Sequence, residues 1–322
     1  MGNIRHPRRG SMQFWPRSRA RHPIARVRYW PAESKVKPLG FIAYKAGMTH
    51  LMVTDNHPKS LTKGESIMLA STILECPPLA VMGVAFYKQT INGWLKVASI
   101  MAPKVDKELA RAFPLAKKQV KSFSDISDYD DVRLLVHTNP KLTSIGTKKP
   151  KVLEIAIGGQ KADKVKYAQD MLGKEITIDQ VFDAGNQLNI HGITKGKGMQ
   201  GTVKRYGVPI RQHKAEKTKR GIGTLGSWHP NRVEYTVAQS GKMGYHLRTE
   251  YNKQIIKIGK DAQDLAVKGG IIHYGILENA YALIKGSVMG PKKAPVLLTH
   301  ATRSNLHFVK DAPEVTYISL EN

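Results

Sequence analysis

The residues with the most capacity for chemistry lie between Phe182 and Trp228, where glycines and cations are interspersed. The glycines leave this segment little capacity for regular helix. The only acid between Asp183 and Glu234 is Glu216. The cations between Phe182 and Trp228 are Lys195, Lys197, Lys204, Arg205, Arg211, Lys214, Lys217, Lys219 and Arg220. A flexible segment this basic repels itself and cannot bury an apolar core alone. It is therefore expected to order against a polyanion, and a nucleic-acid backbone is the best match.

Within this segment, residues 196–201 spell GxGxxG, the pattern of a dinucleotide-binding turn. That turn needs a preceding strand and a helix that opens at its third glycine. Gly207 and Pro209 follow too closely for a helix of useful length. Close approach of the backbone to phosphates is the favoured interpretation, with Lys195 and Lys197 supplying charge. A dinucleotide-dependent enzyme stays open as an alternative.

Other catalytic or metal-binding patterns find little support. The chain has 12 histidines but no HExxH, and no GxSxG surrounds Ser227. His191, His213 and His229 are interpreted as exposed or base-stacking, although a histidine-only metal site stays open. Trp228 is either a core residue or part of an RNA-inserted finger, and its flanking Gly226 and Pro230 favour the finger. The acidic run Asp125–Asp131 lacks the glycine and distant glutamate of a calcium loop, so a solvated turn is expected.

The beginning of the chain forms a second basic stretch, an arm whose cations precede the first acidic residue, Glu33. Phe14, Trp15, Tyr29 and Trp30 are interleaved with its arginines, and several prolines block helix formation. Guanidinium groups pair with phosphates and stack on bases, as aromatic rings do, so RNA contact is expected, with a plain disordered tail as the alternative. The arginines concerned are Arg5, Arg8, Arg9, Arg17, Arg19 and Arg21.

The overall composition supports a folded, nucleic-acid-binding protein. A hydrophobic fraction of 41% over 322 residues supports a real core, and the net charge of +26 favours a polyanionic partner. No apolar run approaches the ~18 residues that span a bilayer. Cys76 is the only cysteine, which excludes an internal disulfide and indicates a reducing, intracellular setting.

Strand signals fall on both sides of a mixed region. Short runs rich in β-branched residues begin at Leu39, with a break expected at Gly47 and a hairpin turn at Asn92-Gly93. Residues 104–120 have helical spacing, residues 132–138 and 152–159 resemble strands, and a helix is expected near 163–172. Strand signals resume near 175 and continue beyond the basic segment. The pattern predicts an antiparallel sheet or barrel with an α/β insertion.

Several motifs resemble the ribosomal protein L3 (uL3) family. The spacing of Phe182, Asn189, Gly192, Thr194, Gly196-Lys197-Gly198, Gly201 and Arg205 resembles the family signature. RHPRRGSMQFWPR resembles the family's N-terminal arm, GFIAYKAGMTH its first barrel strands, and GSWHPNRVEYTVAQSGKMGYHLRTE its later core. The resemblance covers nearly the whole chain, and the long arm and insertion are similar to the archaeal/eukaryotic form.

This resemblance implies a translation-protein-type β-barrel on the outside of the large ribosomal subunit. It also implies two extensions that run through rRNA towards the peptidyl transferase centre, the second being the loop from Arg205 to Trp228. Implied partners are large-subunit rRNA, ribosomal protein L14 and an L24e-type protein, with no membrane and no stable homo-oligomer. No cofactor is implied, since structural Mg ions would belong to the rRNA. Some family members carry a methylated histidine in this loop; His213 is the nearest candidate, but its spacing to Trp228 differs.

We therefore expect a mostly β chain in four parts: a basic N-terminal extension (1–38), a first barrel part (39–102), an α/β insertion (103–175) and a second barrel part (176–322) with a finger at 190–233. The expected function is that of a cytoplasmic, ribosome-bound rRNA-binding protein that aids assembly and has no catalytic activity. Another basic RNA- or DNA-binding protein is the alternative. The expected rRNA contacts are Arg5, Arg8, Arg9, Arg17, Arg19, Arg21, Lys195, Lys197, Lys204, Arg205, Arg211, His213, Lys217, Lys219, Arg220, Trp228, His229 and Arg232.

Overall fold

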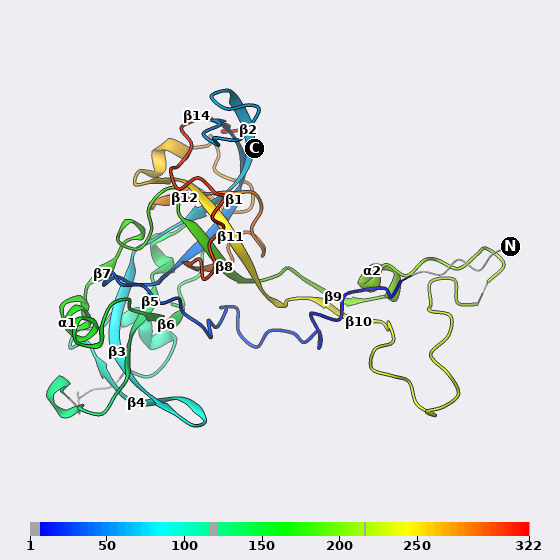
Figure 1. Cartoon of the computed structure of the whole chain (residues 1–322), viewed down its shortest axis with the longest axis horizontal. Coiled ribbons are helices and arrows are strands. Elements are labelled where there is room, and N and C mark those ends of the chain that lie inside the picture. Colours follow the sequence, from blue (N-terminus) through cyan, green and yellow to red (C-terminus); the bar gives the residue numbers. More distant parts are fainter. Residues whose placement is uncertain (1–6, 116–121, 216, 322) are drawn as a thin grey trace. The chain divides into compact units, whose positions relative to one another are not determined.

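The chain folds into two compact units. A computed structural model describes residues 7–115, 122–215 and 217–321. The first unit combines Met1–His22 with Ile193–Arg248, and the second combines Pro23–Gly192 with Thr249–Asn322. Strands predominate over helices along the chain (Figure 1), so the expected mostly β fold is confirmed. The finer four-part division stays a prediction.

Six strands close a barrel at the centre of the second unit (Figure 1). Each strand pairs with the next and the last pairs with the first, so every member has a partner on both sides. In ring order the strands are β1 (Gly40–Thr54), β2 (Ser66–Glu75), β12 (Tyr281–Lys285), β11 (Leu247–Gly259), β8 (Gln187–Ile193) and β13 (Pro295–His300). A further strand, β14 (Val315–Ile318), pairs with the later part of β1.

Strand β1 runs through the position where a break was predicted. Its register against β2 shifts between Lys45 and Gly47, so the expected interruption is a β-bulge and the prediction of a break is wrong. The strand serves two partners along its other edge: Gly40–Tyr44 pair with β13, and Leu51–Val53 pair with β14. The Lys45 side chain is buried between these two regions, and its ammonium group donates to the carbonyl oxygens of Val288 and Gly290.

A second sheet in the same unit has the strand order β4-β3-β5-β6. Its bounds are β3 (Leu79–Thr90), β4 (Gly93–Met101), β5 (Asp131–Thr138) and β6 (Val152–Ala156), and β7 (Glu175–Ile176) pairs with β3. The predicted hairpin at Asn92-Gly93 is confirmed, because Thr90 faces Gly93, whose φ of 108° suits glycine. The strands expected near 132–138 and 152–159 are also present. The stretch 103–175, distinct in composition, thus supplies two strands to the sheet that β3 and β4 begin.

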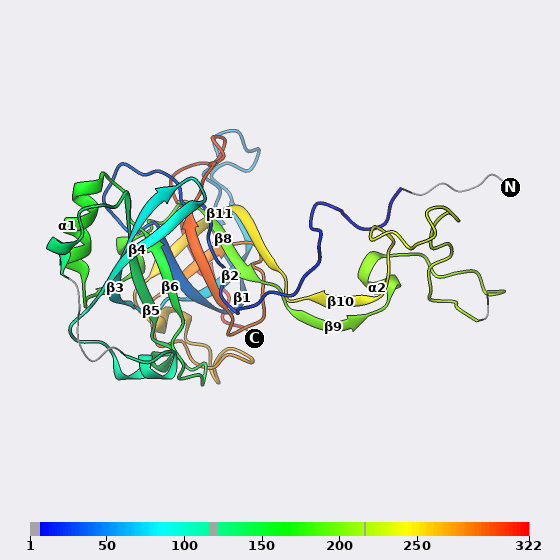
Figure 2. The same ribbon diagram turned by 90° about the horizontal axis from the view of Figure 1, so that it is seen from below.

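Helices are few. The helix expected near 163–172 is confirmed as α1 (Lys161–Met171), which packs beside β5 (Figure 2). The helix expected over 104–120 is wrong for residues 104–115, where only a 3-10 turn at Lys107–Arg111 forms, capped by the Asp106 side chain. Pro114 disfavours helical geometry at Phe113 and cannot donate a helical hydrogen bond. Residues 116–120 lie outside the described residues. Further 3-10 turns occupy Phe123–Asp125, Pro140–Leu142, Ile178–Gln180 and Ala262–Leu265.

One hydrophobic core joins the barrel to the second sheet. It includes Phe41 and Leu298 from the barrel, Val84 and Leu134 from the second sheet, and Ala168 from α1. A backbone hydrogen bond extends this joint, since Leu39 N donates to Ala156 O at 2.9 Å. The helices among the described residues include none long and apolar enough to cross a membrane.

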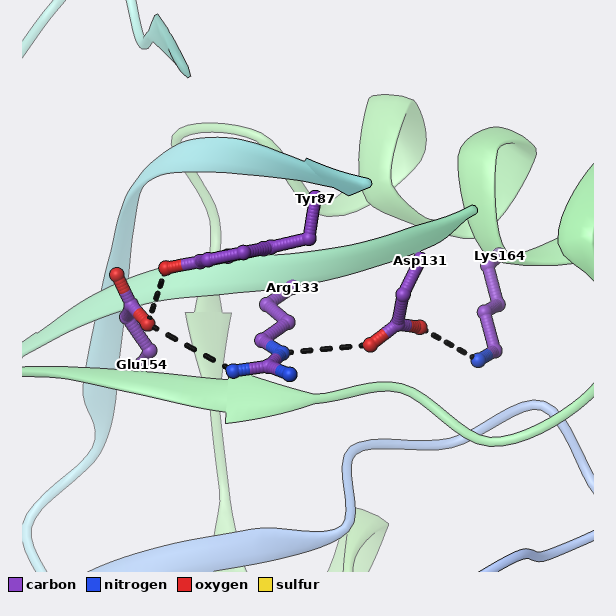
Figure 3. A network of polar contacts seen from close by, with 5 residues as sticks. All are labelled: Tyr87, Asp131, Arg133, Glu154 and Lys164. Carbon is purple, nitrogen blue, oxygen red and sulfur yellow. Dashed lines mark hydrogen bonds and ion pairs between the residues drawn. The ribbon is translucent and has the colours of Figure 1, made fainter. Parts of the chain in front are cut away.

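The second sheet also carries a chain of polar contacts (Figure 3). Lys164 Nζ lies 2.8 Å from Asp131 Oδ1, and Arg133 Nε lies 3.3 Å from Asp131 Oδ2. The Tyr87 hydroxyl donates to Glu154 Oε2 at 2.6 Å, and the Arg133 guanidinium stacks on the Tyr87 ring at 4.4 Å. On this sheet, therefore, cations are neutralised by carboxylates of the same chain.

His300, at the end of β13, is held neutral by its surroundings. Its ring centroid lies 4.6 Å from that of Phe182, and its Nε2 is buried with no hydrogen-bond partner among the described residues. Burial, assisted by the nearby Lys37 ammonium, lowers the pKa of His300 from 6.5 to about 4. The unfolded chain therefore takes up a proton between pH 6.5 and 4 that the folded chain does not, and stability is lost over that window as pH falls.

We predict that lowering the pH from 7 to 5 reduces the free energy of unfolding through His300 by at most about 2 kcal/mol. In the His300→Gln variant this contribution is absent, so urea denaturation at the two pH values should show a smaller loss than in the wild type. The His50→Gln variant, altered at an exposed histidine, is the control. An identical pH dependence in wild type and His300→Gln would contradict the prediction.

Candidate nucleic-acid interface

The first unit is organised around a two-stranded ribbon. Strand β9 (Gly196–Gln200) pairs antiparallel with β10 (Gly241–Gly244) (Figure 2). Lys195, just before β9, and Lys197, within it, are exposed. The GxGxxG pattern therefore lies on an antiparallel ribbon, whereas a dinucleotide turn needs a parallel βαβ unit. The helix that follows, α2 (Thr202–Tyr206), is only 5 residues long and ends at Gly207, whose φ of 70° is left-handed. The ribbon does not have the geometry of the dinucleotide alternative.

The N-terminal arm packs on residues next to this ribbon through backbone and ring contacts. Ala20 N donates to Tyr245 O at 2.8 Å, and His246 Nδ1 donates to Ser18 O at 2.8 Å. Trp15 lies edge-on to Tyr235, with ring centroids 5.8 Å apart, and 6.4 Å from the Tyr206 ring. Residues far apart in the sequence thus form one folded unit.

Arginines of this unit bind carbonyl oxygens and aromatic faces. The Arg17 guanidinium lies 4.2 Å from the Tyr206 ring centroid and donates to Arg205 O at 3.0 Å. The Arg205 guanidinium donates to Gln239 O at 2.9 Å and to Lys242 O at 3.2 Å. These bonds fix the side chains and leave their positive charge in place.

The finger is closed by similar bonds. Arg211 N donates to Lys219 O at 3.0 Å, and the Arg211 guanidinium donates to Ile222 O. Thr202 Oγ1 donates to Arg220 O at 3.2 Å, which ties α2 to the middle of the finger. The finger therefore has local order of its own.

Positive charge in the first unit is almost uncompensated. The unit contains eighteen lysines and arginines, and its only acids are Glu216 and Glu234, so it carries sixteen of the 26 net charges. Among the described residues of this unit, no lysine or arginine forms an ion pair with a carboxylate, whereas the second unit contains several such pairs. A surface of this kind attracts a polyanion over distances comparable to the Debye length.

The structure brings the predicted contacts together in this one unit. Arg5 lies outside the described residues. Those exposed are Arg8, Arg19, Arg21, Lys195, Lys197, Lys204, His213, Lys217, Lys219, Arg220, Trp228, His229 and Arg232. Arg9, Arg17, Arg205 and Arg211 are partly buried. Trp228 is 79% exposed, which excludes the core interpretation for this side chain. Which of these residues touch RNA stays a prediction.

Sequence reasoning missed three members of the surface. Lys242 lies on β10, Arg248 stacks on the exposed Phe14 ring at 4.6 Å, and Tyr235 is 72% exposed. Burial, with repulsion from Arg17, lowers the pKa of Arg248. The aromatic residues interleaved in the arm were the one available signal, because they require partners somewhere in the chain.

A barrel-containing chain with a cationic unit rich in aromatic rings belongs to the class of proteins that bind folded nucleic acid. The family model described as "Ribosomal protein L3" matches residues 1–320, and the chain belongs to this family. It is 44% identical to the large ribosomal subunit protein uL3 of Methanocaldococcus jannaschii, with 98% of this chain and 97% of that protein covered. It is 38% identical to the uL3 of Methanothrix thermoacetophila, with 100% and 99% covered.

We predict that Trp15→Ala releases the arm from the rest of the first unit, because it removes the ring that packs on Tyr206 and Tyr235. The free energy of local opening should fall by about 1–3 kcal/mol. Hydrogen exchange at the amide of Ala20 measures this directly. Tyr29→Ala, which removes an exposed ring outside the first unit, is the matched control. Unchanged protection of Ala20 in Trp15→Ala would show that the arm is held by other contacts.

Proposed function

We propose that this protein is a structural constituent of the large ribosomal subunit that binds large-subunit rRNA and aids its assembly. Membership of the ribosomal protein L3 family supports the assignment to the large ribosomal subunit. The observation that carries the RNA-binding role is the uncompensated charge of the first unit, sixteen net charges with no ion pair among its described residues. The protein acts without catalysis or a cofactor of its own, and Mg ions at the interface belong to the rRNA.

The mechanism is electrostatic and steric. The arm and finger enter crowded regions of rRNA, where their cations neutralise phosphates and release condensed counterions. Exposed Trp228 and His229 pack against unpaired bases at a bend of the RNA. The barrel supplies a rigid, folded body for docking. The contacts are the eighteen side chains from Arg5 to Arg232 named above, together with Lys242 and Arg248.

The proposed setting follows the family. The protein is cytoplasmic and ribosome-bound, and its extensions support the region near the peptidyl transferase centre. Its neighbours are other large-subunit proteins, with ribosomal protein L14 and an L24e-type protein proposed among them. It does not associate with a membrane or form a stable homo-oligomer.

We predict that the protein co-migrates with large subunits in a sucrose gradient of cell lysate and stays with them at high salt. Interlocking with folded rRNA prevents dissociation even when long-range attraction is screened. Immunoblotting of the gradient fractions provides the measurement. Loss to the soluble fraction at modest salt would indicate a loosely bound factor and overturn the proposal.

We predict that changing Lys217, Lys219 and Arg220 together to Ala weakens binding to rRNA fragments and flattens its salt dependence. Each lost phosphate contact lowers the slope of log K against log salt by about 0.7–0.9, so the triple variant should lose about 2–3. Fluorescence anisotropy at several salt concentrations measures the slope.

The matched control changes Lys88, Lys96 and Lys257 to Ala, which removes the same total charge. These three cations are partly exposed but paired with Asp128, Glu154 and Asp264. Their loss should leave the slope unchanged. Equal slopes in the finger variant and the wild type would show that these finger residues do not contact the RNA phosphates.

A further inference from the structure

A pocket of about 420 Å³ lies within the first unit, lined by residues 15–17 of the arm, by the end of α2 and by residues between 233 and 240. Its walls include Trp15, Tyr206, Tyr235 and Val233, and its polar lining includes Arg17 and Glu234. The volume falls in the range of sites for small organic ligands. All lining residues belong to the first unit, so the pocket is complete within it.

The walls suit a flat aromatic ligand. The Tyr235 ring is 72% exposed and is held edge-on to Trp15 with centroids 5.8 Å apart. Val233, 46% exposed, adds apolar surface beside it. Unpaired bases stack on exposed tyrosine and tryptophan rings, and each such stack contributes substantially to RNA affinity.

The polar lining combines two cations with a carboxylate. The Arg17 and Arg205 guanidinium groups donate to backbone carbonyls and lie against the Tyr206 ring, so both are fixed at the wall of the pocket. Glu234 is one of only two acids in the whole unit, and a carboxylate repels phosphate. A carboxylate does, however, accept hydrogen bonds from the N–H groups of a base.

We propose that this pocket binds an unpaired guanine base of RNA, stacked on Tyr235 with its Watson–Crick edge donating to Glu234. Guanine presents two adjacent donors, N1–H and the N2 amino group, which match the two oxygens of one carboxylate. Adenine and cytosine present a single amino group on this edge, and uracil a single ring N–H. The assignment rests on the proposed RNA-binding function and adds base selectivity to it.

The test uses the full-length protein and short fluorescent oligouridine RNAs that differ at one central position. That position carries guanine, adenine, cytosine, uracil or no base, so the phosphate charge is constant. Anisotropy is measured at elevated salt, where backbone contacts are weakened. Guanine should bind about tenfold more tightly than uracil, as expected for one bidentate contact. The abasic RNA should bind more weakly than all the others.

Two variants separate selectivity from stacking. Glu234→Gln should remove the preference for guanine over uracil and keep the preference for guanine over the abasic RNA. Tyr235→Ala should remove the dependence on the base, and Tyr235→Phe should restore it, because the ring alone provides the stack. Glu65→Gln, at an exposed glutamate of the second unit, makes the same charge change and should bind as wild type does.

The outcomes distinguish this inference from the proposed function. Salt-dependent binding with equal affinity for guanine and abasic RNA would overturn the pocket assignment while RNA binding stands. No binding to any of these RNAs or to rRNA fragments would overturn both. Binding of free GMP as tightly as the guanine RNA would show that the pocket binds a free nucleotide. It would overturn the proposal that the ligand is a base of RNA. A stronger preference for another base would overturn the role of Glu234.

Discussion

The uncompensated positive charge of the first unit is the constraint on which its architecture depends. Its sixteen net charges repel one another over distances comparable to the Debye length. A unit of this composition cannot rely on ion pairs, and its few buried apolar side chains give it a small core. It is held together instead by the β9–β10 ribbon, by stacked rings around Trp15, and by bonds from guanidinium groups to backbone oxygens.

The two units differ in the groups that accept hydrogen bonds from their cationic side chains. In the first, Arg17, Arg205 and Arg211 donate to carbonyl oxygens, which fixes the side chain and keeps the charge available. In the second sheet, Arg133 and Lys164 bind Asp131, so the charge is cancelled locally. The same side-chain types therefore stabilise structure in both places, and only in the first unit do they also produce a field that reaches a polyanion.

The sequence predicted local features well and long-range ones poorly. The hairpin at Asn92-Gly93, the strands β5 and β6 and helix α1 follow from turn chemistry and periodicity, which act over short stretches of chain. The helix predicted over 104–115 does not form, because Pro114 disfavours helical geometry at the residue before it. The break predicted at Gly47 does not form, because a bulge continues the strand. Closure of the barrel needs β1 to meet β13 near the other end of the chain. The strand pattern left an open sheet and a barrel as alternatives, and the resemblance to a known family favoured the barrel. In the site, the charged side chains were visible from composition, but the docking of Trp15 on Tyr206 and Tyr235 was not, because it joins segments that are distant in the sequence.

The first unit combines two segments that are far apart in the sequence, and this has a consequence for the synthesis of the chain. The arm leaves the translating ribosome well before its packing partners, which end at Arg248, far downstream in the chain. At an elongation rate of about 5–20 residues per second, the arm waits for about 10–50 s without them. During that interval it is an unfolded cationic peptide. A nascent polycation is therefore available to RNA before its fold exists.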